Sequence, residues 1–201
     1  MVKLGILISG GGSNLQAIID AIESKQLNAS IELVVSSKAE TYGLERAKRV
    51  GIPVMALSRD DYMDPLATDE RIAGALQDAQ VDYVVMAGYM RKVRNPLLAA
   101  FPNKIINIHP ALLPSFPGAH GIKDAFDYGV KLTGVTVHFA NEEYDEGAII
   151  AQEVVEVAEE DTLESLEEKI HNVEHTLYPR VLELIAQGRV IMKDNGRVAV
   201  I

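Results

Sequence analysis

Lys3-Leu4-Gly5-Ile6-Leu7-Ile8-Ser9 runs directly into Gly10-Gly11-Gly12-Ser13-Asn14-Leu15, and this junction decides the fold class. The first stretch is an apolar run typical of a strand that is buried on both faces. Apolar residues at helical spacing follow from Leu15 to Lys25. Glycines between a strand and a helix allow a tight turn where backbone N–H groups and the helix N-terminus converge on an anion. The junction therefore predicts a strand, an anion-binding turn and a helix.

The residues around the turn favour a phosphate monoester over NAD or ATP. A nucleotide-binding Walker loop requires Gly-Lys-Ser/Thr, and a dinucleotide fingerprint requires a third glycine where Leu15 stands. It also requires an acidic residue near the end of the second strand, which instead ends in Ser36-Ser37-Lys38. The alternative is a turn that merely needs glycine, with Ser13 or Asn14 as the helix N-cap.

Strands and helices alternate over the first half of the chain. Further strands are predicted at Ile31–Val35, Val54–Leu57, Tyr83–Ala87 and from Ile105, with helices at Tyr42–Val50, Asp69–Gln80 and Pro96–Phe101. This order predicts an α/β fold, a Rossmann-like, mostly parallel twisted sheet flanked by helices. Ligands bind beyond the carboxyl ends of such strands, where the loops Ser9–Asn14, Gly88–Arg91 and His109–His120 are expected.

The pattern changes after residue 118. Two strands, Thr133–Ala140 and Ile149–Val157, flank the acidic loop Asn141–Gly147, which favours a mixed sheet with antiparallel strands toward the C-terminal part. Asp161 and Glu164 resemble a capping pair, so a long amphipathic helix is predicted to begin there.

Two features are predicted beyond the start of this helix. Pro179 is expected to bend or break it, because proline lacks the N–H that a helix interior uses. Asp194-Asn195-Gly196 is a turn candidate for a terminal hairpin between Val190–Met192 and Arg197–Val200.

The composition limits the class of protein. With 201 residues, 48% of them hydrophobic and 24% charged, the chain is expected to form one domain. A net charge of −10 argues against nucleic acid as a partner, and the absence of cysteine excludes disulfides, thiolate metal sites and a thiol nucleophile. No apolar run approaches the length of a membrane span and no cleavable leader is evident, so we expect a soluble cytoplasmic protein with no membrane partner.

Asn107 and His109 are candidate catalytic residues. Side chains two residues apart on a strand project from the same face, so the amide and the imidazole can address one reacting group. Pro110 cannot donate to a strand ladder and should end the strand at that point. The pair predicts oxyanion stabilisation together with proton transfer.

A carboxylate partner for His109 is expected in the acidic loop. Asp145 is the best candidate because Gly147 lets the backbone turn sharply nearby, although a solvated charge run is the simpler interpretation of the loop alone. A carboxylate beside His109 would raise the pKa of the imidazole and favour the cation.

The remaining histidines are interpreted more simply. His138 is expected to be a satisfied core histidine at a strand end. His171 and His175 lie one helical turn apart with no clear third ligand, so a helix face is favoured over a metal site.

Several blocks in the same order resemble the phosphoribosylglycinamide formyltransferases, folate-dependent formyltransferases of purine biosynthesis. The resemblance runs from about residue 4 to about residue 192. It rests on Ile8–Gln16, Ala87–Arg91, Ile106–Pro114, Phe116–Gly118, Val137–Phe139, Asp145-x-Gly147 and Glu174-His175-x-x-Tyr178-Pro179.

This resemblance implies an enzyme of one-carbon metabolism that transfers a formyl group from 10-formyltetrahydrofolate, its co-substrate, to the amine of glycinamide ribonucleotide. It implies a phosphate site at Gly12, Ser13 and Asn14, a ribose contact at Glu174, and the catalytic set Asn107, His109 and Asp145. The implied folate-binding residues are Met90, Arg91, Lys92, Val93, Asn107 and Asn141. No metal is implied, and a monomer or homodimer of one formyltransferase domain is expected, with a phosphate-binding half at about 1–105 and a catalytic and folate-loop half at about 106–201.

The implied mechanism is direct attack of the amine on the formyl carbon. Asn107 and protonated His109 would stabilise the tetrahedral oxyanion, and Asp145 would orient His109 and match its charge. A water molecule nearby would relay the proton from the amine to the departing folate nitrogen. No covalent enzyme intermediate is needed, because a neutral amine is already nucleophilic.

The chain departs from the family pattern around the site. Tyr62-Met63-Asp64-Pro65 stands where relatives carry a folate-binding arginine, and Arg59 is displaced from that place. Ile122 and His171 replace a histidine and a lysine. Three alternatives to the main interpretation are a 10-formyltetrahydrofolate hydrolase, a methionyl-tRNA formyltransferase and a non-catalytic nucleotide- or folate-binding module. The methionyl-tRNA formyltransferase would need a further domain and a basic surface.

Overall fold

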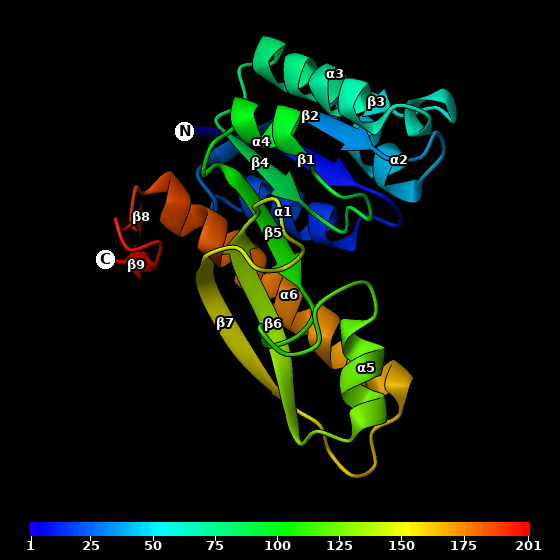
Figure 1. The fold of residues 1–201 in the computed structure, drawn as a ribbon, viewed down its shortest axis with the longest axis vertical. Coiled ribbons are helices and arrows are strands. Elements are labelled where there is room, and N and C mark those ends of the chain that lie inside the picture. Colours follow the sequence, from blue (N-terminus) through cyan, green and yellow to red (C-terminus); the bar gives the residue numbers. More distant parts are fainter.

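A seven-stranded sheet in the order β3-β2-β1-β4-β5-β6-β7 forms the centre of the computed structural model, which describes residues 1–201 (Figure 1). Its strands are β1 (Val2–Ile8), β2 (Ala29–Ser36), β3 (Val54–Ala56), β4 (Tyr83–Met86), β5 (Ile105–His109), β6 (Leu132–Phe139) and β7 (Ile149–Glu156). β1 to β5 are parallel, whereas β6 and β7 are antiparallel to their neighbours. The predicted Rossmann-like, mostly parallel sheet with antiparallel strands in its C-terminal part is confirmed.

Helices cover both faces of the sheet. They are α1 (Ser13–Glu23), α2 (Tyr42–Arg49), α3 (Pro65–Asp78), α4 (Asn95–Ala100), α5 (Gly121–Tyr128) and α6 (Leu163–Ala186), with one 3-10 turn, η1 (Asp60–Tyr62). Figure 1 shows α3 and α4 over one face and α1 and α6 over the other, with α5 beside α6. None of these helices combines the length and the apolar character that a membrane span requires.

The two faces of the sheet carry separate apolar cores. Ile6 and Ile8 of β1 pack in the core shared with α1 and α6, while Leu7 between them packs in the core shared with α3 and α4. Successive strand residues point to opposite faces, so a strand covered on both sides must be apolar at nearly every position. This double coverage explains the continuous apolar run from Leu4 to Ile8.

The strand register brings the candidate site residues together at the carboxyl end of β5. In the parallel pair β4–β5, Met86 lies opposite Asn107. In the antiparallel pair β5–β6, Asn107 lies opposite His138 and His109 lies opposite Thr136. A chain that returns antiparallel beside β5 therefore delivers its own side chains to the end of that strand.

Two helices differ from the sequence prediction. α3 begins at Pro65 and not at Asp69, because the Asp64 side chain accepts a hydrogen bond from the Ala67 N–H and Pro65 occupies the first turn. α5, which packs against α6, was not predicted at all. Its eight residues are too few to give a clear helical periodicity.

The long helix α6 also begins differently. Thr162 caps it in a reciprocal pair with Ser165, so the predicted pairing of Asp161 with Glu164 is wrong. The helix runs unbroken through Pro179, which is buried, so a break there is also wrong. The predicted terminal hairpin is confirmed as β8 (Val190–Met192) and β9 (Val198–Val200).

Tyr178 joins α6 to the strands that carry the candidate site. Its side chain is completely buried, and its hydroxyl oxygen lies 3.0 Å from both the Met86 and the Ile106 carbonyl oxygens. The hydroxyl donates to one of these carbonyls at a time, because it has a single proton. It is the polar contact between the helix layer and the ends of β4 and β5.

We predict that Tyr178→Phe lowers the free energy of unfolding by about 1–3 kcal/mol, because it leaves buried carbonyl groups without their donor. Urea-induced unfolding measures the change. Tyr128→Phe is the matched control, since Tyr128 is 80% exposed and its hydroxyl makes no hydrogen bond in the structure, and it should change the same quantity by less than about 0.5 kcal/mol. Equal effects of the two substitutions would contradict this role of Tyr178.

Candidate active site

A cavity of about 730 Å³ lies at the carboxyl ends of β1, β4 and β5. Three loops predicted to meet there do so: residues 10–14 after β1, residues 87–93 after β4, and residues 110 and 117–119 after β5. Residues of the acidic loop and of α6 complete the lining, among them Asp145, His171 and Glu174. The cavity is within the volume range of small-molecule sites, about 300–1,000 Å³.

The glycine turn after β1 leaves the start of α1 open to the cavity. Gly12 is the N-cap in a left-handed conformation, with φ of 71°, and no side chain caps the helix. A Cβ on Gly12 would lie 2.8 Å from the Cα of Gly43, so both the backbone angle and the close approach of α2 require glycine. The N-cap is therefore neither Ser13 nor Asn14. The first N–H groups of α1 are therefore free to bind an anion.

Asn14 and Glu174 form a buried pair beside this turn. Asn14 Nδ2 donates to Glu174 Oε2 at 3.1 Å, and Asn14 Oδ1 is buried without a partner. Burial raises the pKa of Glu174, and the bond from Asn14 and the nearby His171 oppose that rise only in part. The pair thus presents a carboxyl oxygen and a vacant amide oxygen to groups that carry hydroxyl hydrogens.

His109 sits at the end of β5 with acceptors at both ring nitrogens. Its Nε2 lies 2.7 Å from the Phe116 carbonyl oxygen, and its Nδ1 lies 3.5 Å from Asp145 Oδ2. A carbonyl only accepts, so the proton of a neutral ring resides on Nε2 and leaves Nδ1 bare beside Asp145. Burial lowers the pKa of His109, and Asp145 opposes this effect without reversing it. The expectation of a raised pKa is therefore wrong in its net direction.

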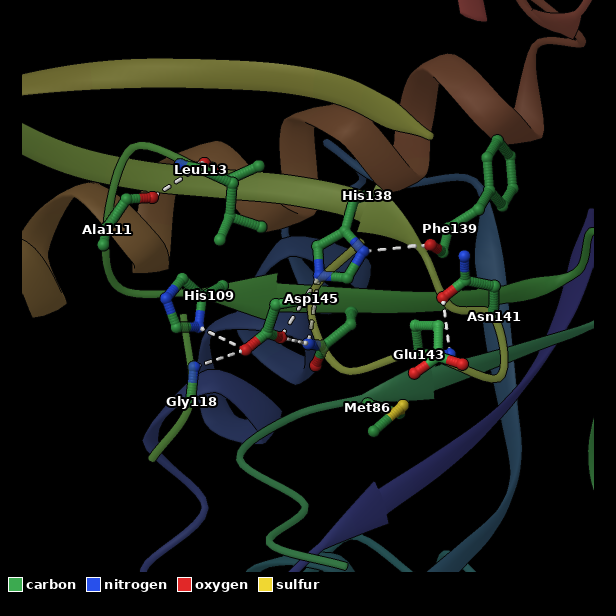
Figure 2. A network of polar contacts seen from close by, with 12 residues as sticks. Met86, His109, Ala111, Leu113, Gly118, His138, Phe139, Asn141, Glu143 and Asp145 are labelled. Atoms are coloured by element: carbon green, nitrogen blue, oxygen red, sulfur yellow. Dashed lines mark hydrogen bonds and ion pairs between the residues drawn. The ribbon is translucent and has the colours of Figure 1, made fainter. Parts of the chain in front are cut away.

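The Asp145 carboxylate lies between three partners. Its Oδ2 accepts from the Gly118 N–H at 2.8 Å, its Oδ1 lies 3.4 Å from Asn107 Nδ2, and His109 is on its other side (Figure 2). Burial raises the pKa of Asp145, but the hydrogen bond from the Gly118 N–H opposes burial, and the pKa stays below the ordinary value. The carboxylate is therefore ionised around neutral pH.

The backbone of the acidic loop explains how Asp145 reaches inward. Asp145 itself takes the left-handed conformation, with φ of 56°, which aspartate tolerates better than most residues. Gly147 is needed for a different reason from the predicted sharp turn, because a Cβ there would lie 1.6 Å from the Phe139 carbonyl oxygen. The loop passes so close to β6 that only glycine fits.

His138 is a site residue that the sequence interpretation placed in the core. Its Nδ1 lies 2.9 Å from the Phe139 carbonyl oxygen, so Nδ1 carries the proton and Nε2 is an acceptor (Figure 2). Asn107 Nδ2 donates to this Nε2 at 3.2 Å, which fixes which end of the Asn107 amide faces the imidazole. His138 is both buried and fully bonded, as expected, and it also orients Asn107.

A second network fixes the chain just after His109. Thr136 Oγ1 donates to the Ala111 carbonyl at 2.7 Å and accepts from the Leu113 N–H at 3.1 Å. Gln152 of β7 donates to the Leu113 carbonyl and to Thr136. These bonds hold the turn that follows β5, and with it the direction in which His109 points.

The residues expected to bind folate also border the cavity. These are Met90, Arg91, Lys92, Val93, Asn107 and Asn141. The Met90 N–H donates to Ser9 Oγ at 2.8 Å, which ties this segment to the end of β1. The Asn141 side chain accepts from the Glu143 N–H and so shapes its own loop.

The segment after β3 lies apart from the cavity lining. The Tyr62 hydroxyl donates to the Ser37 carbonyl at 2.5 Å, and the Arg91 guanidinium lies 4.4 Å from the centre of the Tyr62 ring. Neither Tyr62 nor Arg59 borders the cavity, so Arg91, which belongs to the expected folate segment, is the only arginine in the cavity lining.

His171 and His175 stack with ring centroids 6.4 Å apart on α6. No group of three or more His, Asp or Glu side chains lies close enough together to hold a metal ion. His171 borders the cavity beside Glu174, whereas His175 faces a groove between α1 and α6.

Comparison with known proteins agrees with this geometry. The formyl transferase family model matches residues 2–182. The chain is 42% identical over 195 residues to phosphoribosylglycinamide formyltransferase of Haemophilus influenzae, covering 97% of this chain and 92% of that protein. It is 40% identical over 196 residues to the human trifunctional purine biosynthetic protein adenosine-3. That match covers 98% of this chain but only 19% of the much longer human protein, so the chain spans about a fifth of the length of that relative.

The fold comparison gives the same family. The crystal structure of glycinamide ribonucleotide transformylase 1 from Symbiobacterium toebii superposes with a TM-score of 0.96 at 45% identity, covering 100% of this chain and 94% of that chain. Since the family match extends over nine-tenths of the residues, from the start of β1 to the last turns of α6, the chain belongs to the formyl transferase family.

Proposed function

We propose that this protein transfers a formyl group from 10-formyltetrahydrofolate to the amine of glycinamide ribonucleotide in purine biosynthesis. The observation that carries the proposal is the convergence of Asn107, His109 and Asp145 on a cavity that also contains an open helix N-terminus. Groups for acyl chemistry and for an anion thus border the same space. The names of the full-length relatives support this choice of donor and acceptor.

In this proposal the nucleotide occupies the β1 end of the cavity. Its phosphate accepts from the backbone at Gly12, Ser13 and Asn14, where the dipole of α1 favours negative charge. Its ribose hydroxyls donate to Glu174, whose position is fixed by Asn14. The net charge of −10 means that these local groups, and not the overall field, hold the anion.

The folate then lies along the segment after β4 and the acidic loop. Met90, Arg91, Lys92 and Val93 line the cavity together with Asn107 and Asn141. Lys92 lies 5.6 Å from the centre of the Tyr144 ring, so a cation and an aromatic face are presented side by side. No metal is required, because attack by an amine on a formyl group needs no Lewis acid.

The reaction proposed is direct attack of the neutral amine on the formyl carbon. The Asn107 N–H that faces Asp145 at 3.4 Å is only weakly bonded, so it is available to donate to the developing oxyanion. His109, neutral at rest, takes the proton of the attacking nitrogen at Nδ1, directly or through a water molecule. The resulting imidazolium is stabilised by Asp145 and adds to the stabilisation of the oxyanion.

Collapse of the tetrahedral intermediate completes the transfer. The C–N bond to the folate breaks, and the departing folate nitrogen receives the proton held by His109, so the enzyme returns to its starting state. The protonated His109 of the original expectation thus arises during the reaction, because burial disfavours it beforehand.

We further propose that residues 1–201 act as one domain, with a phosphate-binding half to about residue 105 and a catalytic and folate-loop half from about residue 106. The partners are the two small-molecule substrates and not nucleic acid, the protein is a cytoplasmic monomer or homodimer, and 10-formyltetrahydrofolate is its only cofactor. The length and composition support a single domain, and the net charge of −10 supports the exclusion of nucleic acid.

A formyl-transfer assay with glycinamide ribonucleotide and 10-formyltetrahydrofolate tests the function. Formylation of the ribonucleotide supports the proposal. Formate release that does not depend on this acceptor would favour the hydrolase, and binding without turnover would favour a non-catalytic module.

We predict that Asn107→Ala lowers kcat about 10²–10³-fold, because one donor to the oxyanion is lost. Steady-state kinetics at saturating concentrations of both substrates measures this change. Asn172→Ala, on the exposed face of α6, is the control of the same residue type and should leave kcat unchanged. A kcat for Asn107→Ala close to that of the control would rule out the proposed role.

A pH profile tests the proton acceptor. The proposed step requires neutral His109. A plot of kcat against pH should therefore rise with a midpoint below the ordinary histidine pKa of about 6.5 and then level off.

Asp145→Asn removes the charge that partly sustains the pKa of His109. The midpoint of this acid limb should therefore move to lower pH, and the maximal kcat should fall. The apparent pKa of the acid limb belongs to the coupled pair of His109 and Asp145 and not to His109 alone. A limb that moves to higher pH in Asp145→Asn would contradict the assignment.

A further inference from the structure

Arg46 of α2 contacts the glycine turn from the side away from the cavity. Its Nε donates to the Gly11 carbonyl oxygen at 2.9 Å, and its Nη1 donates to Gln16 Oε1 on α1 at 2.9 Å. Arg46 does not border the active-site cavity and instead lines the groove between α1 and α6. It therefore acts on the turn without touching anything bound in the cavity.

A second bond from α2 holds the neighbouring peptide. The Gly43 N–H donates to the Gly10 carbonyl oxygen at 3.1 Å. In a trans peptide the C=O and the following N–H point in opposite directions. Holding the carbonyls of Gly10 and Gly11 against α2 therefore turns the N–H groups of Gly11 and Gly12 away from α2, toward the cavity that both residues border.

The Arg46 side chain is itself well restrained. Its guanidinium lies 4.6 Å from the centre of the Tyr42 ring, a cation–π contact, while two of its nitrogens are bonded. A guanidinium stays charged at all relevant pH values and donates along two fixed directions at once. The turn is thus backed by a fixed positive charge and a rigid donor.

We propose that Arg46 is a positioning residue for the phosphate of the nucleotide substrate, which it aids by orienting the N–H groups of the glycine turn from behind. This inference rests on the proposed function, since it takes the turn as the phosphate site. A purely structural role, in which Arg46 only joins α2 to α1, would instead affect stability without a selective effect on phosphate-bearing ligands.

Three variants separate these roles. Arg46→Met removes the charge and the donors but keeps the length of the side chain, and Arg46→Lys keeps the charge but not the two-directional donor. Arg49→Met is the matched control, since Arg49 is exposed on the same helix and lies 5.3 Å from the centre of the same Tyr42 ring without contacting the turn. Each variant is assayed for kcat, for the KM of both substrates, and for competitive inhibition by inorganic phosphate.

We expect Arg46→Met to raise the KM for glycinamide ribonucleotide about tenfold, the equivalent of one charge-assisted hydrogen bond. The inhibition constant of inorganic phosphate should rise by a similar factor, while kcat and the KM for 10-formyltetrahydrofolate stay unchanged. Arg46→Lys should fall between Arg46→Met and wild type, and Arg49→Met should match wild type. Thermal unfolding of each variant identifies loss of folding separately.

The inference is overturned if Arg46→Met keeps the wild-type KM for the ribonucleotide, or if kcat and both KM values change together. It is also overturned if Arg46→Met lowers only the thermal midpoint, as a structural role requires. A failure of the proposed function can be distinguished from a failure of this inference, because the wild-type protein itself would then not formylate the ribonucleotide.

Discussion

The Asp145 carboxylate is the charge around which the candidate site is organised. It lies between the Asn107 amide and the His109 imidazole and is held by the Gly118 N–H. An ionised carboxylate at a buried place is stable only when donors surround it. Asn107 is both one of these donors and a group that addresses the substrate, and His109 becomes a second when it gains a proton during the reaction. The contacts that hold Asp145 therefore also orient the catalytic side chains.

The scaffold supplies this arrangement through backbone geometry. The antiparallel return of β6 beside β5 places His138 opposite Asn107, and the close approach of the acidic loop to β6 at Gly147 carries Asp145 inward. At the far end of the cavity, the turn after β1 leaves the α1 N-terminus uncapped and is backed by α2. Rigid strand ends thus set the distance between the anion site and the reacting groups.

The local patterns predicted the parallel half of the fold well, because continuous apolar strands and amphipathic helices are encoded in nearby residues. Asn107 and His109 were recognisable from their spacing at the end of a strand. His138 was not, because its role depends on the register between β5 and β6, which is a long-range property. The pKa of His109 was misjudged for a similar reason, since burial outweighs Asp145 and burial cannot be read from spacing.

A crystal structure with glycinamide ribonucleotide bound tests the central claim most directly. The account predicts the phosphate against the backbone N–H groups at Gly12 to Asn14, with the amine about 3 Å from a polar atom of Asn107 or His109, or joined to it by one water molecule. A phosphate bound elsewhere, or an amine directed away from Asn107 and His109 while the phosphate is in place, would contradict the account.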